Sequence, residues 1–138
     1  LFDRGIETAI LPTSARHGLG QLVYSPLAQG VLTGKYMPGQ PVPANSRASD
    51  PKHGQFVQRY LSESRLLQAQ RLKELAERAA LSPTQVALAF CLRDPRVASV
   101  LVGARDSRQL DASLAAVGVV LSAELLTELD QLFPLGAS

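Results

Sequence analysis

The hydrophobic pattern of the chain changes between short continuous runs and helical spacing. Two short runs, Leu22–Tyr24 and Val97–Val102, have the near-continuous apolar character of buried strands in a parallel sheet. From Phe56 to Ala80 apolar residues recur every three or four positions, which predicts an amphipathic helix. Pro83–Leu92 is apolar almost all round. This second helix should therefore be the more buried of the two.

Capping signals place the helix boundaries. Ser82 and Gln85 have the spacing of a capping box, and Pro83 between them suits the first helical position. Glycine, proline and capping residues similarly predict three further helices. These are expected at about Thr13–His17, Ser107–Val117 and from Ser122 to near Phe133.

A long segment from Met37 to Phe56 is rich in proline, glycine and small polar residues. Loops of this length are usually functional lids or disordered segments, and both interpretations permit motion. Arg47 and His53 lie within it. His53 has no neighbouring histidine, cysteine or carboxylate pattern that would indicate a metal site.

The charges exclude some classes of function. The 138 residues carry a formal net charge of only +2, with acidic and basic residues interspersed. No basic stripe with interleaved aromatic residues is present, so nucleic-acid binding is not expected. No apolar run reaches the roughly 18 residues of a membrane helix, so no membrane association is expected.

The single cysteine, Cys91, lies in an apolar run and is expected to be a structural core residue. A lone thiol is consistent with the reducing cytosol, and the start of the chain lacks a signal-peptide layout, so a cytoplasmic protein is expected. Leu1 is not an initiator methionine. We therefore expect the chain to be a piece of a longer protein.

The turn after the first predicted strand carries candidate binding chemistry. Ser25-Pro26 ends the strand, and small residues, a second hydroxyl at Thr33 and the cation Lys35 follow. Ligands of α/β sheets bind at the carboxyl ends of strands, so this turn could hold a phosphate. An ordinary loop is the alternative. A second candidate anion site is the strand-to-helix turn Gly103–Ser107, although many structural turns have this pattern.

The order of residues Tyr24–Tyr36, YSPLAQGVLTGKY, closely resembles the seventh strand and following loop of the aldo-keto reductase superfamily. The similarity is nearest the class that includes the potassium-channel β-subunits and bacterial relatives. It extends to LFDR at the start, LSPTQVALAFCL, VASVLVGARDSRQLDASLAAV and LSAELLTELDQL. This resemblance implies an α/β fold, the C-terminal part of a (β/α)8 TIM barrel with about strands 7 and 8 and their flanking helices, incomplete on its own. Residues 1–138 would be one portion of an NADP-dependent oxidoreductase domain.

The resemblance also implies a site for NADP(H). By position, Tyr24 matches the aromatic residue that stacks on the nicotinamide ring. Lys35 matches a phosphate-binding lysine, and Arg47 an arginine of the mobile loop near the adenosine phosphates. The pyrophosphate turn would comprise Ser25, Pro26, Leu27, Ala28, Gln29 and Gly30, and the 2′-phosphate and adenine site Gly103, Arg105 and Gln109. Where the family commonly has glutamate and asparagine, this chain has Ala112 and Ser113, which weakens the expectation of tight adenine binding and strict NADP preference.

The family reduces carbonyl compounds by hydride transfer, with a tyrosine, lysine, aspartate and histidine on its first four strands. Tyr24, Tyr36 and Tyr60 do not match the context of the catalytic tyrosine, so no catalytic residue is predicted here. The expected function is the cofactor-binding portion of a reductase of aldehydes or ketones. The alternative is a truncated, non-catalytic remnant that binds nucleotide weakly or binds a partner. Two strands alone would expose unpaired edges, which favours a complementing N-terminal half or self-association.

Overall fold

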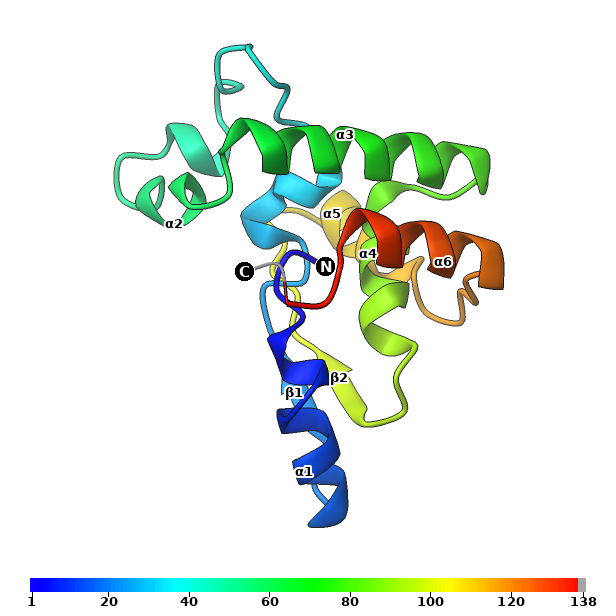
Figure 1. Ribbon diagram of the computed structural model, residues 1–138. Helices are drawn as coiled ribbons and strands as arrows, with labels where there is room; N and C mark the ends of the chain where they lie inside the picture. The colour runs from blue at the N-terminus through cyan, green and yellow to red at the C-terminus, as the bar shows by residue number, and fades with distance from the viewer. Residues whose placement is uncertain (137–138) are drawn as a thin grey trace.

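The computed structural model describes residues 1–136, which form a helix-rich α/β structure (Figure 1). A single parallel sheet of two strands is present among these residues. Both predicted strands are therefore confirmed, with altered boundaries. In chain order the elements are η1 (Gly5–Glu7), α1 (Ile10–Arg16), β1 (Gln21–Val23), η2 (Ala28–Thr33), η3 (Arg47–Ser49), α2 (Gln55–Gln58), α3 (Glu63–Arg78), α4 (Pro83–Leu92), β2 (Val97–Val100), α5 (Ser107–Leu114) and α6 (Ala123–Leu132), where η denotes a 3-10 helix.

The two strands pair in parallel, with Leu22 opposite Ser99 and Val23 opposite Val100. The ladder continues beyond β2, where the amide of Leu101 donates to the carbonyl oxygen of Val23 at 2.8 Å. At the other end the strands approach so closely that a Cβ atom on Gly20 would lie 2.9 Å from the Cβ of Ala98. This parallel pairing brings the turns that follow the two strands to the same edge of the sheet.

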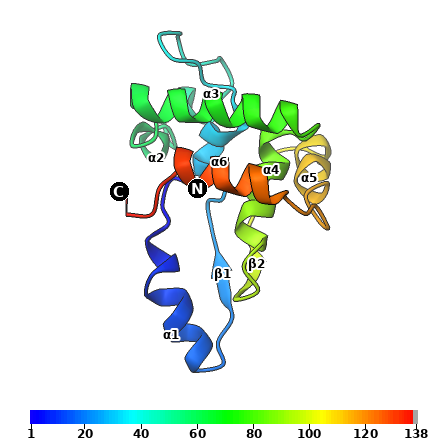
Figure 2. The ribbon, with the colours of Figure 1, turned by 45° about the vertical axis from the view of Figure 1, so that its right-hand side comes forward.

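The helices form a layer at one end of the molecule, and the sheet and α1 project from it as a narrow limb (Figures 1 and 2). Helices α3 and α6 lie side by side, and α4 runs from beneath α3 past α6. The buried residues of these helices pack together with those of η2. The N-terminal segment joins this core through Phe2, whose ring stacks on Tyr60 and meets Phe133 edge-on. The largest fully buried side chains include Val31, Leu32, Tyr36, Leu72, Val86, Phe90 and Leu129.

Local sequence explains why α4 begins at Pro83. The hydroxyl of Ser82 accepts from the amide of Gln85 at 3.2 Å, and the Gln85 side chain accepts from the amide of Ser82 at 2.9 Å. These reciprocal bonds confirm the predicted capping box. The apolar residues Val86–Phe90 are all buried, as expected for a helix that packs between α3 and β2.

The single helix predicted from Phe56 to Ala80 is wrong, because the structure divides it into α2 and α3. The chain leaves the helical conformation after Arg59, and Ser62 is extended, with φ −61° and ψ 146°. Tyr60 explains the break, because its ring is buried against Phe2 instead of following the helical path. Tertiary packing here outweighs a helical pattern that continues through the sequence.

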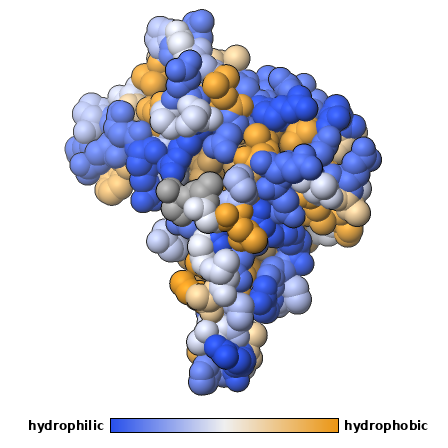
Figure 3. All heavy atoms as spheres, in the orientation of Figure 1, coloured by the Kyte–Doolittle hydropathy of each residue, from blue (hydrophilic) through white to orange (hydrophobic). Residues whose placement is uncertain are grey.

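The expectation of fully buried strands is also wrong. In β1, Leu22 is 63% exposed, and Tyr24, which lies just beyond the strand, is 77% exposed. The second strand ends at Val100, and Leu101 and Val102 are exposed. Each strand pairs along one edge only, and within residues 1–136 no layer covers the free face of the pair. Figure 3 accordingly shows apolar side chains at the surface of the limb.

Cys91 lies in α4 and is half-buried. Burial raises the pKa of its thiol above the ordinary value, which disfavours the reactive thiolate. Every helix in the described part of the chain is too short or too polar to cross a lipid bilayer.

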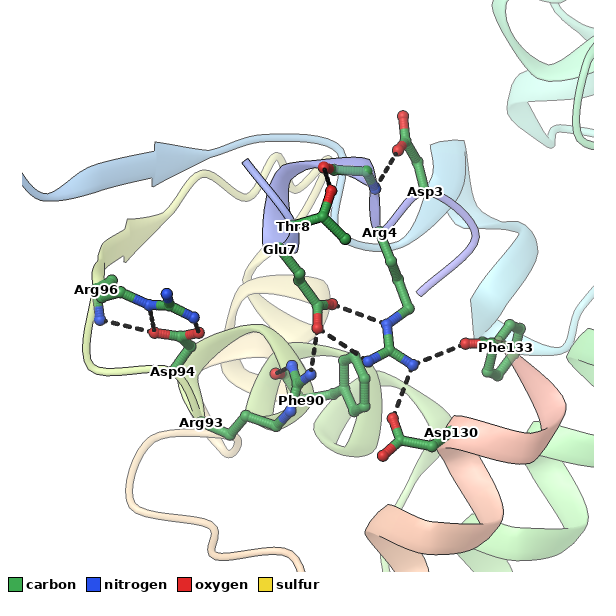
Figure 4. Close-up of polar contacts among 11 residues, drawn as sticks. Asp3, Arg4, Glu7, Thr8, Phe90, Arg93, Asp94, Arg96, Asp130 and Phe133 are labelled. Carbon is green, nitrogen blue, oxygen red and sulfur yellow. Dashed lines mark hydrogen bonds and ion pairs between the residues drawn. The ribbon is translucent and has the colours of Figure 1, made fainter. Parts of the chain in front are cut away.

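A buried arginine joins the two ends of the chain (Figure 4). Arg4 is only 6% exposed, and its guanidinium donates to both carboxylate oxygens of Glu7, at 2.8 and 2.9 Å. It also donates to the carboxylate of Asp130 at 2.7 Å and to the carbonyl oxygen of Phe133 at 2.8 Å. Burial alone would raise the pKa of Glu7, but the hydrogen bonds and charges of Arg4 and Arg93 outweigh it and lower that pKa.

The connection between α4 and β2 depends on a second ion pair. The carboxylate of Asp94 accepts from the amide of Arg96 at 2.9 Å and from its guanidinium at 2.8 and 2.6 Å (Figure 4). The carbonyl oxygen of Arg96 then accepts from the amide of Gln21 at 2.9 Å. The turn therefore fixes the start of β2 against β1.

We predict that Glu7→Gln destabilises the protein by about 2 kcal/mol at neutral pH, because a buried guanidinium loses charged hydrogen bonds. Chemical denaturation followed by circular dichroism would measure the change. Glu128→Gln is the matched control, since Glu128 pairs with the exposed Arg78 and should matter much less. Equal losses in the two variants would contradict a special role for the buried network.

We predict that the Asp94–Arg96 pair makes the free energy of unfolding depend on pH in the acidic range. The hydrogen bonds from Arg96 lower the pKa of Asp94 from 3.8 to about 2. A lowered folded-state pKa gives stability that is present above pH 3.8 and is lost as the pH falls through about 2. Asp94→Asn should remove this part of the pH dependence, as measured by thermal unfolding between pH 2 and 6. An unchanged profile would show that the pair does not contribute.

Candidate functional site

The turn after β1 has an unusual backbone. Ser25, Ala28 and Gln29 have φ values of 52°, 47° and 58°, in the left-handed region that residues with a side chain rarely adopt. Gln29 and Gly30 interrupt η2, so the 3-10 helix is kinked instead of continuous. The amide of Ala28 donates to the carbonyl oxygen of Ser25, and the Gln29 side chain donates to the Ser25 hydroxyl, at 2.9 and 3.0 Å. Strain of this kind concentrates at functional sites.

A pocket of about 830 Å³ lies beside this turn. Its walls come from the turn itself, from the loop that includes η3, and from the end of β2 with the start of α5. The lining residues are Ser25, Pro26, Leu27, Gln29, Gly30, Thr33, Lys35, Ser46, Arg47, Asp50, His53, Thr84, Leu101, Val102, Gly103, Arg105, Gln109, Ala112 and Ser113.

All but two of the residues predicted to bind the cofactor line this pocket. The exceptions are Tyr24 and Ala28, which line a second cavity of about 540 Å³. Ala28 is buried, whereas the ring of Tyr24 is largely exposed. Ser25 and Pro26 line both cavities, so the two adjoin at this point of the turn.

The loop from Met37 to Phe56 crosses the pocket as a defined segment. The guanidinium of Arg105 donates to the carbonyl oxygen of Asn45 at 2.7 Å, and Arg47 donates to the side-chain oxygen of Gln29. Asn45–Arg47 therefore connects the start of α5 to the turn after β1. On the core side, the amide of Ala48 donates to the Tyr36 hydroxyl at 3.2 Å. The sequence allowed a lid or a disordered segment here and did not indicate these contacts. We call the loop from Met37 to Phe56 the strap.

The pocket is rich in positive charge. In the described part of the chain, Lys35, Arg47 and Arg105 form no ion pair with a carboxylate. The ammonium of Lys35 lies 5.2 Å from the centre of the Tyr36 ring and folds back over Gly30. Three cations at one pocket suit a ligand with several phosphate groups.

One acidic residue also lines the pocket. Asp50 accepts from the ring Nδ1 of His53, at 3.0 Å, and hydrogen bonding from His53 lowers the pKa of Asp50. Sequence reasoning considered His53 only as a metal ligand and did not place Asp50 at the site. Within residues 1–136 there is no cluster of three or more histidine, cysteine or acidic residues suited to a metal ion.

Side chains satisfy two of the backbone amides at the start of α5. Asp106 caps the helix by accepting from the amide of Gln109 at 2.9 Å, and the Gln109 side chain accepts from the amide of Arg105 at 3.1 Å. The guanidinium of Arg105 is the charged group here that could bind an anion. Among residues 1–136 nothing lies within 4 Å of a Cβ placed on Gly103, so the space beside this residue is open.

Ala112 and Ser113, where the sequence resemblance led us to expect glutamate and asparagine, also line the pocket. Ala112 offers no polar group, and the hydroxyl of Ser113 already donates to the carbonyl oxygen of Gln109 at 3.0 Å. The remaining lining residues that sequence reasoning missed, Ser46 and Thr84 among them, belong to segments that only folding brings beside the turn. The position of Ser46 next to Arg47 was the one signal that could have identified it.

Comparison with known proteins identifies the family to which the chain belongs. The profile of the Aldo/keto reductase family matches residues 1–133. Among curated relatives, a probable voltage-gated potassium channel subunit beta of Arabidopsis thaliana is 36% identical over 115 residues, which cover 83% of this chain and 35% of the relative. L-glyceraldehyde 3-phosphate reductase of Escherichia coli O157:H7 is 35% identical over 133 residues, 95% of this chain and 38% of the relative.

A probable voltage-gated potassium channel subunit beta of Oryza sativa subsp. japonica is 37% identical over 121 residues, 87% of this chain and 37% of that relative. The matched part of the chain thus spans between a third and two fifths of the length of these relatives. The family profile, in contrast, covers nearly the whole of the described chain. The chain belongs to the aldo/keto reductase family.

Proposed function

We propose that this chain is the cofactor-binding, C-terminal portion of an NADP(H)-dependent aldo-keto reductase that reduces aldehydes or ketones. The observation that carries the proposal is the pocket after β1, which Lys35, Arg47 and Arg105 line without an ion pair to any carboxylate of residues 1–136. Family membership supports an oxidoreductase. When bound, NADPH would supply the hydride for carbonyl reduction.

The donor set of the pocket fits a phosphorylated dinucleotide. The guanidinium of Arg105 can bind two oxygens of a 2′-phosphate at once, and Gly103 leaves room for close approach beside it. Arg47 contacts Gln29 and Lys35 lies beside Gly30, so both are near the turn Ser25–Gly30 and would neutralise the pyrophosphate. A ligand that extends from Arg105 past Pro26 would reach the adjoining cavity.

Tyr24 would take the other end of the cofactor. Its ring stands at the end of β1 beside the second cavity, and an exposed aromatic face at this position suits stacking on a nicotinamide ring. A small carbonyl substrate would have to bind next to this ring. The residues that donate the proton would come from other parts of the complete barrel.

The exposed strands support a further part of the proposal. The free face of the β1–β2 pair and its unpaired edges need covering, because they present apolar side chains and backbone donors to water. A complementing N-terminal segment of the barrel, or a second copy of the chain, would provide this cover. The single, half-buried cysteine suits work in the reducing cytoplasm.

We predict that Arg105→Ala, in the full-length protein that carries this chain, raises the Kd for NADPH at least about tenfold, because a bidentate charged contact is lost. The Kd for NADH should change much less, since NADH lacks the 2′-phosphate. Fluorescence titration with each nucleotide would measure both constants. Equal losses for the two nucleotides would contradict the assignment of Arg105 to the 2′-phosphate.

Arg108→Ala is the matched control for this experiment. Arg108 is one turn further along, its side chain is 92% exposed, and it does not line the pocket. The Arg108→Ala substitution removes the same charge three residues further along, within α5, without touching the pocket. A loss of NADPH affinity as large as that of Arg105→Ala would indicate a general charge effect.

We predict that NADPH protects the strap from trypsin. Arg47 and Lys52 are exposed cleavage sites in the loop that crosses the pocket, and phosphates bound beneath it would add contacts to the existing tethers. Mass spectrometry of timed digests would show slower cleavage after both residues. Cleavage after Arg16, at the end of α1, should not change. Equal rates at the loop with and without NADPH would contradict closure of the strap on the nucleotide.

A further inference from the structure

A glutamine of α3 holds the backbone on both sides of Lys35. The side-chain amide of Gln70 donates to the carbonyl oxygen of Tyr36 at 3.1 Å and to that of Gly34 at 3.4 Å. One amide group therefore contacts both the residue before Lys35 and the residue after it. Gln70 lies 34 positions beyond Tyr36 in the sequence, so folding alone brings this donor to the segment.

The segment that carries Lys35 packs closely on α3. Gly34 and Tyr36 are buried, whereas Lys35 between them is exposed. Gly34 has φ 78°, and a Cβ atom there would lie 3.3 Å from the Cδ of Lys73. The ammonium of Lys35 lies beside Gly30, at the turn after β1. The contacts of the two flanking residues therefore determine where this cation stands.

Lys35 depends on these flanking contacts because no carboxylate holds its ammonium. Within residues 1–136 it forms no ion pair, and the ammonium lies 5.2 Å from the centre of the Tyr36 ring. Tyr36 is only 2% exposed, so its ring is fixed in the core. Gln70 does not line the pocket, whereas Lys35 does. Gln70 can therefore act on a ligand only through the segment that it holds.

We propose that Gln70 is a positioning residue of the pocket, which fixes the backbone of Lys35 so that its ammonium can bind the pyrophosphate of the dinucleotide. The inference rests on the proposed function of the site. A lysine side chain is long and flexible, so a phosphate contact from it costs less ordering when its main chain is already held. Folding, and not the ligand, would then supply this order.

The test measures the Kd for NADPH and for NADH in full-length Gln70→Met, which keeps the length of the side chain but removes the donor. Both Kd values should rise about fivefold, because both nucleotides contain the pyrophosphate. Gln68→Met is the matched control, with Kd values within about twofold of the wild type. Gln68 lies in the same helix and also donates to a carbonyl oxygen, that of Leu132 at 2.8 Å, but neither residue lines the pocket.

A double-mutant cycle separates the positioning of Lys35 from a general effect on the fold. Lys35→Met should itself raise both Kd values about tenfold, because a charged contact is lost. When Gln70→Met is added to Lys35→Met, the further rise should be less than about twofold, because the group that Gln70 positions is already gone. A further rise of about fivefold would overturn the inference, since Gln70 would then act independently of Lys35.

A second variant and a second measurement exclude a purely structural role. In Gln70→Glu the carboxylate has the shape of the amide but cannot donate to either carbonyl oxygen, so both Kd values should again rise. The melting temperatures of unliganded Gln68→Met and Gln70→Met should both fall, because each loses hydrogen bonds, but only Gln70→Met should lose affinity. Lower melting temperatures with unchanged affinity in both variants would overturn the inference.

The remaining outcomes are also decisive. If Gln68→Met weakens binding as much as Gln70→Met, or if Lys35→Met leaves both Kd values unchanged, the inference is overturned while binding of the nucleotide stands. A rise in Kd for NADPH alone would also overturn it, because it would assign Lys35 to the 2′-phosphate instead of the pyrophosphate. If the wild-type protein binds neither nucleotide, the proposed function itself fails.

Discussion

The candidate site depends on the parallel pairing of two short strands, β1 with three residues and β2 with four. The pairing brings the turn after β1 and the turn after β2 to one edge, although about seventy residues separate them in the sequence. The strap then closes the gap by contacting both turns. Two ion pairs stabilise this arrangement. The pair of Asp94 with Arg96 fixes β2 against β1, and the buried guanidinium of Arg4 fixes the N-terminal segment against α6. The register of the two strands therefore determines which side chains meet at the pocket.

Much of this architecture could be predicted because its causes are local. The capping box of α4 and the end of α6 near Phe133 depend on neighbouring residues, and the structure has them where the pattern indicated. The parts that could not be predicted depend on distant contacts. Tyr60 interrupts a helical pattern because Phe2, nearly sixty positions earlier, provides a surface for its ring. The strands have the composition of buried strands but exposed faces, because apolar composition indicates which residues suit burial and not whether a further layer covers them within residues 1–136.

In the candidate site, too, the features with local causes could be predicted and those that depend on distant contacts could not. The order of residues from Tyr24 to Tyr36 was enough to indicate a turn at which phosphates could bind, and most of the residues singled out do line one pocket. The departures have physical reasons. Ala28 is buried, and Tyr24 lies before Ser25, the left-handed residue at which the backbone turns, so that both line the second cavity. Apart from the position of Ser46 next to Arg47, no local signal places Ser46, Asp50 or His53, because a loop rich in proline and glycine does not reveal which of its residues will line a pocket.

The tether between Arg105 and position 45 has a consequence for how the family can vary here. Arg105 binds the main-chain oxygen of Asn45 and not its side chain, and Asn45 has a left-handed backbone with φ 59°. What this position must preserve is therefore a conformation, which asparagine and glycine both adopt readily. The side chain itself is free to change. A comparison of sequences that scores only identity at this position would miss the feature that keeps the two walls of the pocket connected.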